Sequence, residues 1–354
     1  MAQTTRVALL FGGRSAEHDV SLVSAAAVHK NLDPRKYSVH SLYITRAGRW
    51  KVVPSPLVSR RELERGRGLD FLPWTEEGRR AGLRADIYFP VLHGPFGEDG
   101  TVQGLLEMAG VPYVGAGVLG SAVGMDKVVS KMLLESAGLP VVPFRVVLET
   151  DWRRDRAGLL RLVRQEFRLP FFVKPANLGS SVGITKVKRD KAAAAALETA
   201  FRYDRKALVE KGVAGRELEC SVLGNDEPEA SLPGEVIPHR EFYDYKDKYV
   251  DNKTGFVIPA RLPATRVAEV RRLAVAAFRA LDLAGMARVD FFLERASGRL
   301  YVNEVNTIPG FTEISMYPKL WAASGLPFPA LLDRLIALGF ERHRTRRVCV
   351  ERGR

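Results

Sequence analysis

Cysteine is scarce in this chain of 354 residues, which contains only Cys220 and Cys349. The two cysteines lie far apart and do not have the spacing of metal ligands, so no cysteine-based metal site is indicated. Such sparing use of cysteine is typical of a reducing compartment, and a cytoplasmic location is therefore expected.

Long apolar runs and a signal-peptide pattern are also missing. No stretch approaches the ~18 apolar residues needed to cross a membrane, so no membrane partner is expected. The N-terminus passes directly into strand-like residues, Arg6 to Phe11. With 46% hydrophobic and 27% charged residues, the composition is ordinary for a globular protein, and the length allows two or three domains.

Acidic residues are outnumbered, and the formal net charge is +13. Basic residues cluster at 59–84, at 152–168 and at 342–354, where six arginines lie. Nucleic-acid binding would use such charge, but no helix-turn-helix, zinc-finger or RNP-like pattern accompanies it. The favoured interpretation is a solvated surface with a frayed, dispensable C-terminal tail, without a nucleic-acid partner.

Residues 286–310, MARVDFFLERASGRLYVNEVNTIPG, predict a hairpin, because two β-branched and aromatic runs flank the turn-like Ala296-Ser297-Gly298. Alternation along the strands gives two sets of side chains that share a face: Arg288, Asp290 and Phe292, and Val302, Glu304 and Asn306. Asp290 would lie across from Glu304. Carboxylate and amide oxygens without His or Cys favour Mg²⁺; a solvated polar face is the alternative.

Two glycine-rich turns follow strands near the N-terminus. The strand at 7–11 runs into GGRSAEH and a helix, a pattern typical of a phosphate- or carboxylate-binding corner. Glu17 in this corner would alternatively complement the helix dipole. A buried strand at 86–92 ends at HGPFGEDG, where α/β sheets bind ligands. His93 is interpreted as a substrate contact rather than a surface histidine, and 46–84 as an irregular insertion.

A glycine pattern at 115–120 matches the dinucleotide fingerprint G-x-G-x-x-G. The ribose-binding acid expected about 20 residues later has no good candidate, since Glu135 lies inside a helix predicted for 126–137. A nicotinamide enzyme is therefore rejected, and a domain boundary is placed near 120–140.

Lys174 lies in a predicted strand at 170–175, which is followed by the small-residue loop 176–184. Backbone N–H groups of such a loop and the lysine would reach the same anion, although a hairpin with an exposed lysine is the alternative. Strands are predicted at 207–213 and 217–223. The extended passage between them could bind the edge of a purine through backbone donors and acceptors. Residues 242–255 mix aromatics with charges, as functional lids do.

Taken in order, these motifs resemble the D-alanine–D-alanine ligases of the ATP-grasp superfamily. The matching segments are GGRSAEHDVS, HGPFGEDGTVQG, MDKVVSK, VKPANLGSSVGI, DYKDKY, ARVDFF and NEVNTIPGFT. The resemblance implies an α/β, three-domain ATP-grasp architecture. A parallel α/β substrate domain at 1–122 would precede two α+β domains, 123–213 and 214–341, that grip ATP, and a basic tail would follow at 342–354.

The resemblance also implies a role for each matching residue. Catalytic roles fall to Glu17, Ser180, Tyr249 and Arg288; Glu17 would bind the first amine, and Arg288 would neutralise the oxyanion. The D-alanine contacts would be His93, Gly310, Ser315 and Met316, the last standing where some members have leucine. The ATP contacts would be Lys127, Lys174, Glu210, Lys211, Val213, Glu217 and Lys248. The metal ligands would be Asp290, Glu304 and Asn306.

The implied reaction joins two D-alanines to D-alanyl-D-alanine through a D-alanyl phosphate, for peptidoglycan precursor synthesis. It would use ATP and two Mg²⁺ ions, with Mn²⁺ as a substitute, in a cytoplasmic homodimer. Phosphoryl transfer of this kind depends on positioning and charge neutralisation, and a lid would shield the acyl phosphate from water.

Three alternatives stay open. A D-alanine–D-lactate or D-alanine–D-serine ligase is the close one, although Tyr249 in the lid favours an amine acceptor. Another ATP-grasp carboxylate–amine ligase would share the hairpin and Lys174, but it would have no reason to carry HGPFGEDG and a tyrosine lid. A non-enzymatic nucleotide-binding module is the distant alternative.

Overall fold

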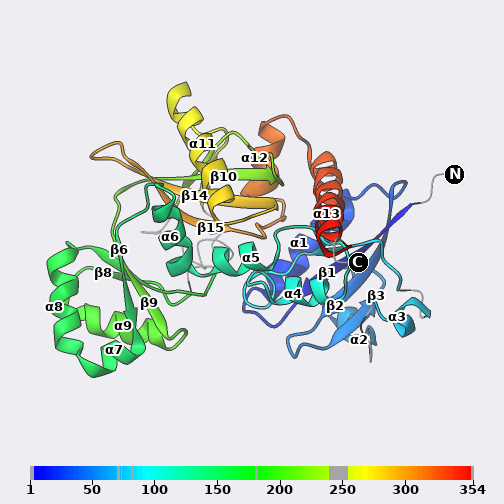
Figure 1. Cartoon of the computed structure of the whole chain (residues 1–354), viewed down its shortest axis with the longest axis horizontal. Coiled ribbons are helices and arrows are strands. Elements are labelled where there is room, and N and C mark those ends of the chain that lie inside the picture. Colours follow the sequence, from blue (N-terminus) through cyan, green and yellow to red (C-terminus); the bar gives the residue numbers. More distant parts are fainter. Residues whose placement is uncertain are drawn as a thin grey trace.

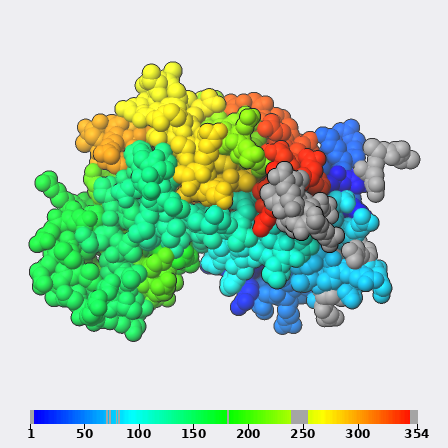
Figure 2. All heavy atoms as spheres, in the orientation of Figure 1, coloured from blue at the N-terminus to red at the C-terminus, as the bar shows by residue number. Residues whose placement is uncertain are grey.

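Three β-sheets with flanking helices make up the protein (Figure 1). The structure is a computed structural model that describes residues 4–69, 72, 74–80, 83–179, 182–238 and 254–351. The architecture is mixed α/β, as the sequence predicted. Figure 2 shows the middle part of the chain (green) as a lobe at one end of the molecule.

The first sheet has the strand order β4-β3-β2-β1-β5. Its parallel strands are β1 (Thr5–Gly12), β2 (Tyr37–Ile44) and β5 (Ile87–Pro90). The apolar run of β1 is buried, as expected for a central parallel strand. The helices of this region are α1 (His18–Asn31), α2 (Arg60–Arg65), α3 (Glu76–Arg80), α4 (Thr101–Met108) and α5 (Val118–Met125).

The interpretation of 46–84 as an irregular insertion is wrong. The segment adds two antiparallel strands to the sheet, β3 (Trp50–Val53) and β4 (Arg67–Gly68). Trp50 lies edge to face with Trp74, which in turn meets Tyr88 of β5. These aromatic contacts fix the segment to the sheet, and they join residues too far apart in sequence to form a local pattern.

The second sheet is antiparallel, with the order β6-β9-β7-β8. Its strands are β6 (Phe144–Leu148), β7 (Phe171–Pro175), β8 (Thr185–Val187) and β9 (Lys206–Lys211). Its flanking helices are α6 (Lys127–Ser136), α7 (Glu149–Arg154), α8 (Arg156–Glu166), the 3₁₀ turn η1 (Asp190–Ala192) and α9 (Ala193–Phe201). Asp126 caps α6 by accepting hydrogen bonds from the N–H groups of Val128 and Val129.

The third sheet has the order β13-β12-β10-β14-β15, with β11 paired to β10. Its strands are β10 (Gly215–Gly224), β11 (Glu229–Ala230), β12 (Gly234–Ile237), β13 (Gly255–Val257), β14 (Gly285–Glu294) and β15 (Leu300–Asn306). Helices α11 (Ala264–Ala280) and α12 (Met316–Ala323) belong to this part of the chain. Strands β14 and β15 form the predicted hairpin.

Helix α13 (Phe328–Glu351) connects the third sheet to the first (Figure 1). Its Leu331 and Leu335 share one hydrophobic cluster with Val7 and Leu9 of β1 and with Met286 of β14. The N-terminal and C-terminal sheets are therefore joined by a common core.

The prediction of a frayed tail from residue 342 onward is wrong in its described part, because α13 continues to Glu351. Arg342 stacks on the ring of Tyr113, with its Cζ 4.0 Å from the ring centroid. Its Nη1 donates to Oε1 of Glu107 at 3.2 Å, and Tyr113 Oη donates to the same oxygen at 2.6 Å. Arg346 also forms an ion pair with Glu107. Arginine contacts of this kind dock the end of the helix although the segment has no apolar periodicity.

Substituting Arg342 with alanine should therefore lower stability. Loss of the half-buried stacking and charge-assisted contacts should cost about 1–2 kcal/mol, which corresponds to a fall in melting temperature of a few degrees. Truncation after Glu341 should do at least as much. Arg344→Ala is the matched control, because Arg344 is exposed on the same helix. Equal melting temperatures for Arg342→Ala and Arg344→Ala would show that the contacts of Arg342 contribute nothing to the free energy of unfolding.

Within the described residues, no single helix has the length and apolarity to cross a membrane. The helices Met316–Ala323 and Phe328–Arg346 reach the required length and apolarity only when they are taken together, and the chain bends by 105° between them.

Candidate active site

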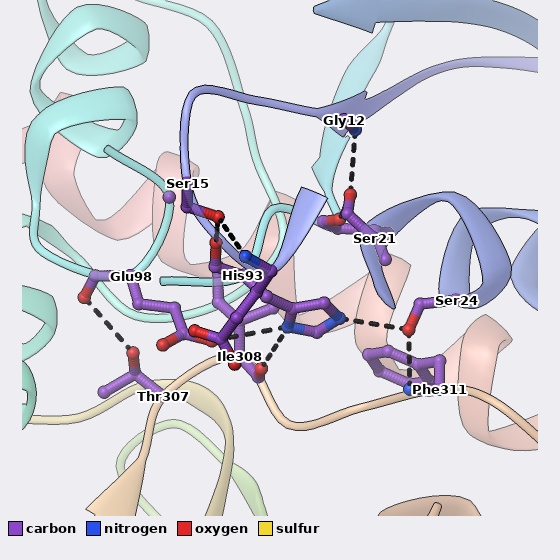
Figure 3. Close-up of polar contacts among 12 residues, drawn as sticks. Gly12, Ser15, Ser21, Ser24, His93, Glu98, Thr307, Ile308 and Phe311 are labelled. Atoms are coloured by element: carbon purple, nitrogen blue, oxygen red, sulfur yellow. Dashed lines mark hydrogen bonds and ion pairs between the residues drawn. The ribbon is translucent and has the colours of Figure 1, made fainter. Parts of the chain in front are cut away.

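The turn after β1 fixes Glu17 at the start of α1. Gly12 has φ +93°, and a Cβ there would lie 2.3 Å from the carbonyl oxygen of Ile44, so glycine is required. Ser15 Oγ accepts from the N–H of Glu17 at 3.1 Å and donates to the carbonyl of His93 at 2.6 Å (Figure 3). The two glycine-rich turns predicted from the sequence thus meet at one place.

Glycines also surround the Glu17 carboxylate. A Cβ on either Gly94 or Gly179 would lie 2.7 Å from Glu17 Oε2. Gly94 belongs to the first sheet's loops and Gly179 to the loop after β7, so the carboxylate lies where the two regions approach. A side chain at either position would displace it.

His93 is buried and held on both ring nitrogens. Its Nδ1 donates to the carbonyl of Ile308 at 3.1 Å and lies 3.3 Å from Glu98 Oε1, while Nε2 lies 3.0 Å from Ser24 Oγ (Figure 3). Burial alone would lower the pKa of His93, but the hydrogen bond and charge of Glu98 raise it overall. Burial raises the pKa of Glu98, and the charge of Glu17 adds to this. Each group thus favours its protonated form more than it would in water.

The hairpin brings the predicted carboxylates face to face. Asp290 on β14 pairs with Glu304 on β15, and Arg288 pairs with Asn306, which confirms the predicted register at this end. A β-bulge follows between Asp290 and Phe291.

The bulge changes which side chains share the cleft face. Because of it, Phe291 pairs with Val302, and Val302 is fully buried. The prediction that Val302 shares the face of Glu304 is therefore wrong. Asn303 lines the cleft beside Glu304 in its place. Asn303 Oδ1 is buried and has no hydrogen-bond partner within the described part of the chain.

Arg288 sits between two acids. It binds Asp290 through two parallel contacts, Nε to Oδ1 and Nη2 to Oδ2, both 2.7 Å, and its Nε lies 3.0 Å from Glu219 Oε2. Asn306 Nδ2 donates to Asp290 Oδ2 at 3.1 Å. Among the described residues no group of three or more His, Cys, Asp and Glu side chains is arranged to hold a metal; the predicted set consists of two carboxylates and an amide.

Lysines approach the hairpin from the second sheet and its helix α6. Lys127 Nζ donates to the carbonyl of Leu178 at 2.5 Å and lies 3.9 Å from Glu304 Oε2. Lys174 is buried and forms an ion pair with Glu210. Burial alone would lower the pKa of Lys174, but the charge of Glu210 outweighs burial and raises it. The pairing with Glu210 thus favours the charged form of Lys174.

Two adjoining pockets share Glu219, Asn303 and Glu304 in their walls. The first pocket is lined by residues that are far apart in the sequence. They include Glu17, His93, Lys127, Arg288, Asn306, Gly310, Ser315 and Met316. A Cβ on Gly310 would lie 2.6 Å from Ser315 Oγ, so the loop closes tightly here.

The second pocket lies between the second and third sheets. It is lined by five of the seven predicted ATP contacts, Lys174, Glu210, Lys211, Val213 and Glu217, together with Pro170, Phe172 and Phe292. The predicted contact Lys127 lines the first pocket instead. Lys211 Nζ binds Glu294 Oε1 at 2.8 Å. Because the side chains of Glu210 and Lys211 are engaged in ion pairs, their contribution to a bound base would come from the backbone.

Two models of known protein families match most of the chain. A model of the "D-ala D-ala ligase N-terminus" matches residues 6–116, and one of the "D-ala D-ala ligase C-terminus" matches residues 133–337. The chain belongs to the D-alanine–D-alanine ligase family. A D-alanine–D-alanine ligase of Solibacter usitatus is 52% identical over 345 residues, covering 97% of this chain and 98% of that protein.

Solved structures of the family share the fold. The D-alanine–D-alanine ligase of Coxiella burnetii has a TM-score of 0.86 and 37% identity, with 98% of each chain covered. A D-Ala:D-Ser ligase of Enterococcus faecalis has a TM-score of 0.82 and 35% identity, covering 95% of this chain and all of that one (100%). The fold of this ligase is therefore ATP-grasp, and its family uses ATP.

Some predicted site residues lie outside the described residues. They are Ser180, Lys248 and Tyr249, together with the lid sequence DYKDKY. The hydrogen-bonded link predicted between Glu17, Ser180 and Tyr249 therefore stays a prediction.

Sequence reasoning assigned no role to three polar residues that line the two pockets, Glu98, Glu219 and Asn303. It also assigned none to Lys131, which pairs with the pocket residue Glu210. Glu219 could have been predicted as a site residue, because it lies two positions after Glu217 on one strand, and residues two apart share a face. Glu98 stands in the same glycine-rich loop as His93. Lys131 and Asn303 carry no local signal, since their placement depends on a distant strand and on the bulge.

Proposed function

We propose that this chain joins two molecules of D-alanine into D-alanyl-D-alanine at the expense of ATP, for peptidoglycan precursor synthesis. One observation carries the proposal: acidic and basic side chains from the N-terminal turns, helix α6 and the hairpin line a single pocket. That pocket adjoins a second one with the features of a nucleotide site. Carboxylate activation followed by amine attack needs these groups together.

The amino-acid substrates would occupy the first pocket. Glu17, held between two glycines, would bind the ammonium of the first D-alanine. His93 and Glu98 contact each other, line the same pocket and would take part in the polar network around that ammonium. Gly310, Ser315 and Met316 would contact the second D-alanine. In this arrangement Arg288 would face the reacting carboxyl group.

The residues of the second pocket fit ATP with two divalent cations. Asp290 and Glu304 face each other across the hairpin and offer only oxygen donors, as Mg²⁺ requires and Mn²⁺ accepts. Asn306 would complete the set. Glu210, Lys211, Val213 and Glu217 would hold the base and ribose. Bound Mg²⁺ would neutralise phosphate charge and orient the transferred phosphoryl group.

The chain's own residues would then act in order. Lys127 and Lys174 would hold phosphate oxygens while the first D-alanine carboxylate becomes D-alanyl phosphate, with Lys248 joining them from the lid. The amine of the second D-alanine would attack the activated carbonyl. Arg288 would stabilise the oxyanion that develops before phosphate leaves. Tyr249 and Ser180 would close the lid over the site and keep water away.

A coupled ADP-release assay tests the proposal directly. D-alanine should drive ADP release and give D-alanyl-D-alanine, whereas D-lactate and D-serine as second substrates should give little product at neutral pH. A chain that binds ATP but releases no ADP with any of these acceptors would contradict the proposed function.

The close alternative has an observation in its favour. The Enterococcus faecalis structure, similar over nearly the whole chain, is described as a D-Ala:D-Ser ligase. The higher identity to D-alanine–D-alanine ligases favours D-alanine as the acceptor. A wild-type preference for D-serine in the same assay would reverse this choice.

We also propose a cytoplasmic homodimer without nucleic-acid or membrane partners. The family resemblance supports this assembly, and the basic surface is explained by solvation. Light scattering should give twice the mass of one chain; the mass of one chain would contradict the dimer.

A further inference from the structure

Lys131 is a lysine for which the proposed reaction has no use. It lies on α6, one helical turn after Lys127, and only 2% of its surface is exposed. It lines neither of the two pockets. A lysine is rarely buried this completely unless its charge is paired, so its presence here calls for a physical explanation.

Lys131 belongs to a buried chain of three charges. Its Nζ lies 2.6 Å from Oε1 of Glu210, and the other carboxylate oxygen of Glu210 pairs with Lys174. Glu210 and Lys174 do line the nucleotide pocket. Glu210 is 1% exposed, so removing either lysine would leave a buried carboxylate with one counter-charge fewer.

The strand register explains how the three residues meet. On the antiparallel pair β7 and β9, Phe172 pairs with Glu210 and Lys174 pairs with Leu208. All four side chains therefore share one face. Val128 of α6 packs on Leu208 on this face, and Lys131 of the same helix then reaches Glu210.

The charges do not cancel in this chain. Burial lowers the pKa of Lys131, and the charge of Glu210 opposes that shift. With both lysines protonated, the three groups carry one net positive charge, and the lysine that lines the pocket is Lys174. Without Lys131, the remaining pair of Glu210 and Lys174 would carry no net charge, and the nearby Glu217 and Glu304 would add negative charge around Lys174. Burial would raise the pKa of Glu210, but Lys131 and Lys174 outweigh it and lower the pKa, so the carboxylate is charged.

We propose that Lys131 is a positioning residue for nucleotide binding: by pairing with Glu210, it leaves Lys174 a net positive charge toward the phosphates of ATP. The proposal rests on the proposed function for the identity of the nucleotide. It assigns to Lys131 no contact with the ligand. Its effect should therefore depend on the number of phosphates and should be absent for the base and ribose alone.

The test compares binding of a non-hydrolysable ATP analogue and of adenosine by calorimetry. Lys131→Met and Lys131→Gln should each weaken binding of the analogue by roughly tenfold, the effect of losing one partly screened charge. Adenosine binding should stay unchanged. Lys131→Gln keeps a donor for Glu210, so it also covers the case in which Lys131→Met does not fold.

A double variant separates charge from structure. In Lys131→Met with Glu210→Gln, Lys174 again carries one unneutralised charge, so binding of the analogue should recover most of the loss. A merely structural role predicts the opposite, since the double variant removes the ion pair altogether. Lys191→Met, which removes an exposed lysine from the same region, controls for overall charge.

Several results would overturn the proposal. These are equal weakening for adenosine and the analogue, no weakening in either single variant, or a double variant no better than Lys131→Met. A wild type that releases ADP with D-alanine while showing any of these would reject the role of Lys131 alone. A wild type that binds neither ligand would reject the proposed function as well.

Discussion

Replacing Glu304 with glutamine should reduce turnover by about a hundredfold or more while the fold is retained. The carboxylate faces Asp290 across the hairpin and lies 3.9 Å from Lys127. Its proposed role is to hold a cation that neutralises phosphate charge. Losing electrostatic stabilisation of this kind typically costs ~3 kcal/mol or more in the transition state.

The change is nearly isosteric, so melting temperature should be close to that of the wild type. Steady-state ADP release at saturating D-alanine and Mg²⁺ measures the effect. Glu135→Gln is the control, because Glu135 is an exposed acid on α6. Near-normal turnover of Glu304→Gln at saturating Mg²⁺ would mean that the hairpin acids are structural.

Replacing Arg288 with methionine should lower kcat by about a hundredfold to a thousandfold, because one donor to the oxyanion is lost. The same change removes the shared partner of Asp290 and Glu219. The buried Glu219 and the partly buried Asp290 would then face each other without this counter-charge, so melting temperature should also fall by several degrees.

A lysine at position 288 distinguishes the two effects. It restores a positive charge between the acids but not the two parallel contacts to Asp290, since only a guanidinium has that planar fork. Arg288→Lys should therefore recover stability more fully than kcat. Arg295→Met, at the exposed turn of the same hairpin, is the control. Full recovery of kcat by lysine would contradict the oxyanion role.

The hairpin shows how far local pattern predicts a site. Alternation along two strands was sufficient to place Asp290 opposite Glu304, because side chains on paired strands alternate with a fixed period of two. The β-bulge after this pair interrupts the alternation, so that Asn303 lines the cleft and Val302 points into the core. A bulge adds one residue to one strand, and nothing in the sequence YVNEVN marks where that residue falls.

Charges that meet across long sequence distances were beyond sequence reasoning. Lys131 looked like one more polar residue on a helix, and Glu210 like the end of a strand beside a purine. Their contact depends on which face of the sheet α6 covers. The same limit applied to Arg342, whose partners Glu107 and Tyr113 lie in the N-terminal third of the chain.

Helix α13 has a consequence for how the protein is made. The core around β1 is completed by Leu331 and Leu335, which leave the ribosome long after Val7 and Leu9. The first region to be synthesised must therefore wait for almost the last one before its apolar surface is covered. Folding during translation would proceed elsewhere first, because the second sheet has a core of its own built from residues 147–209. Chains interrupted before α13 should expose the N-terminal sheet to proteases and chaperones.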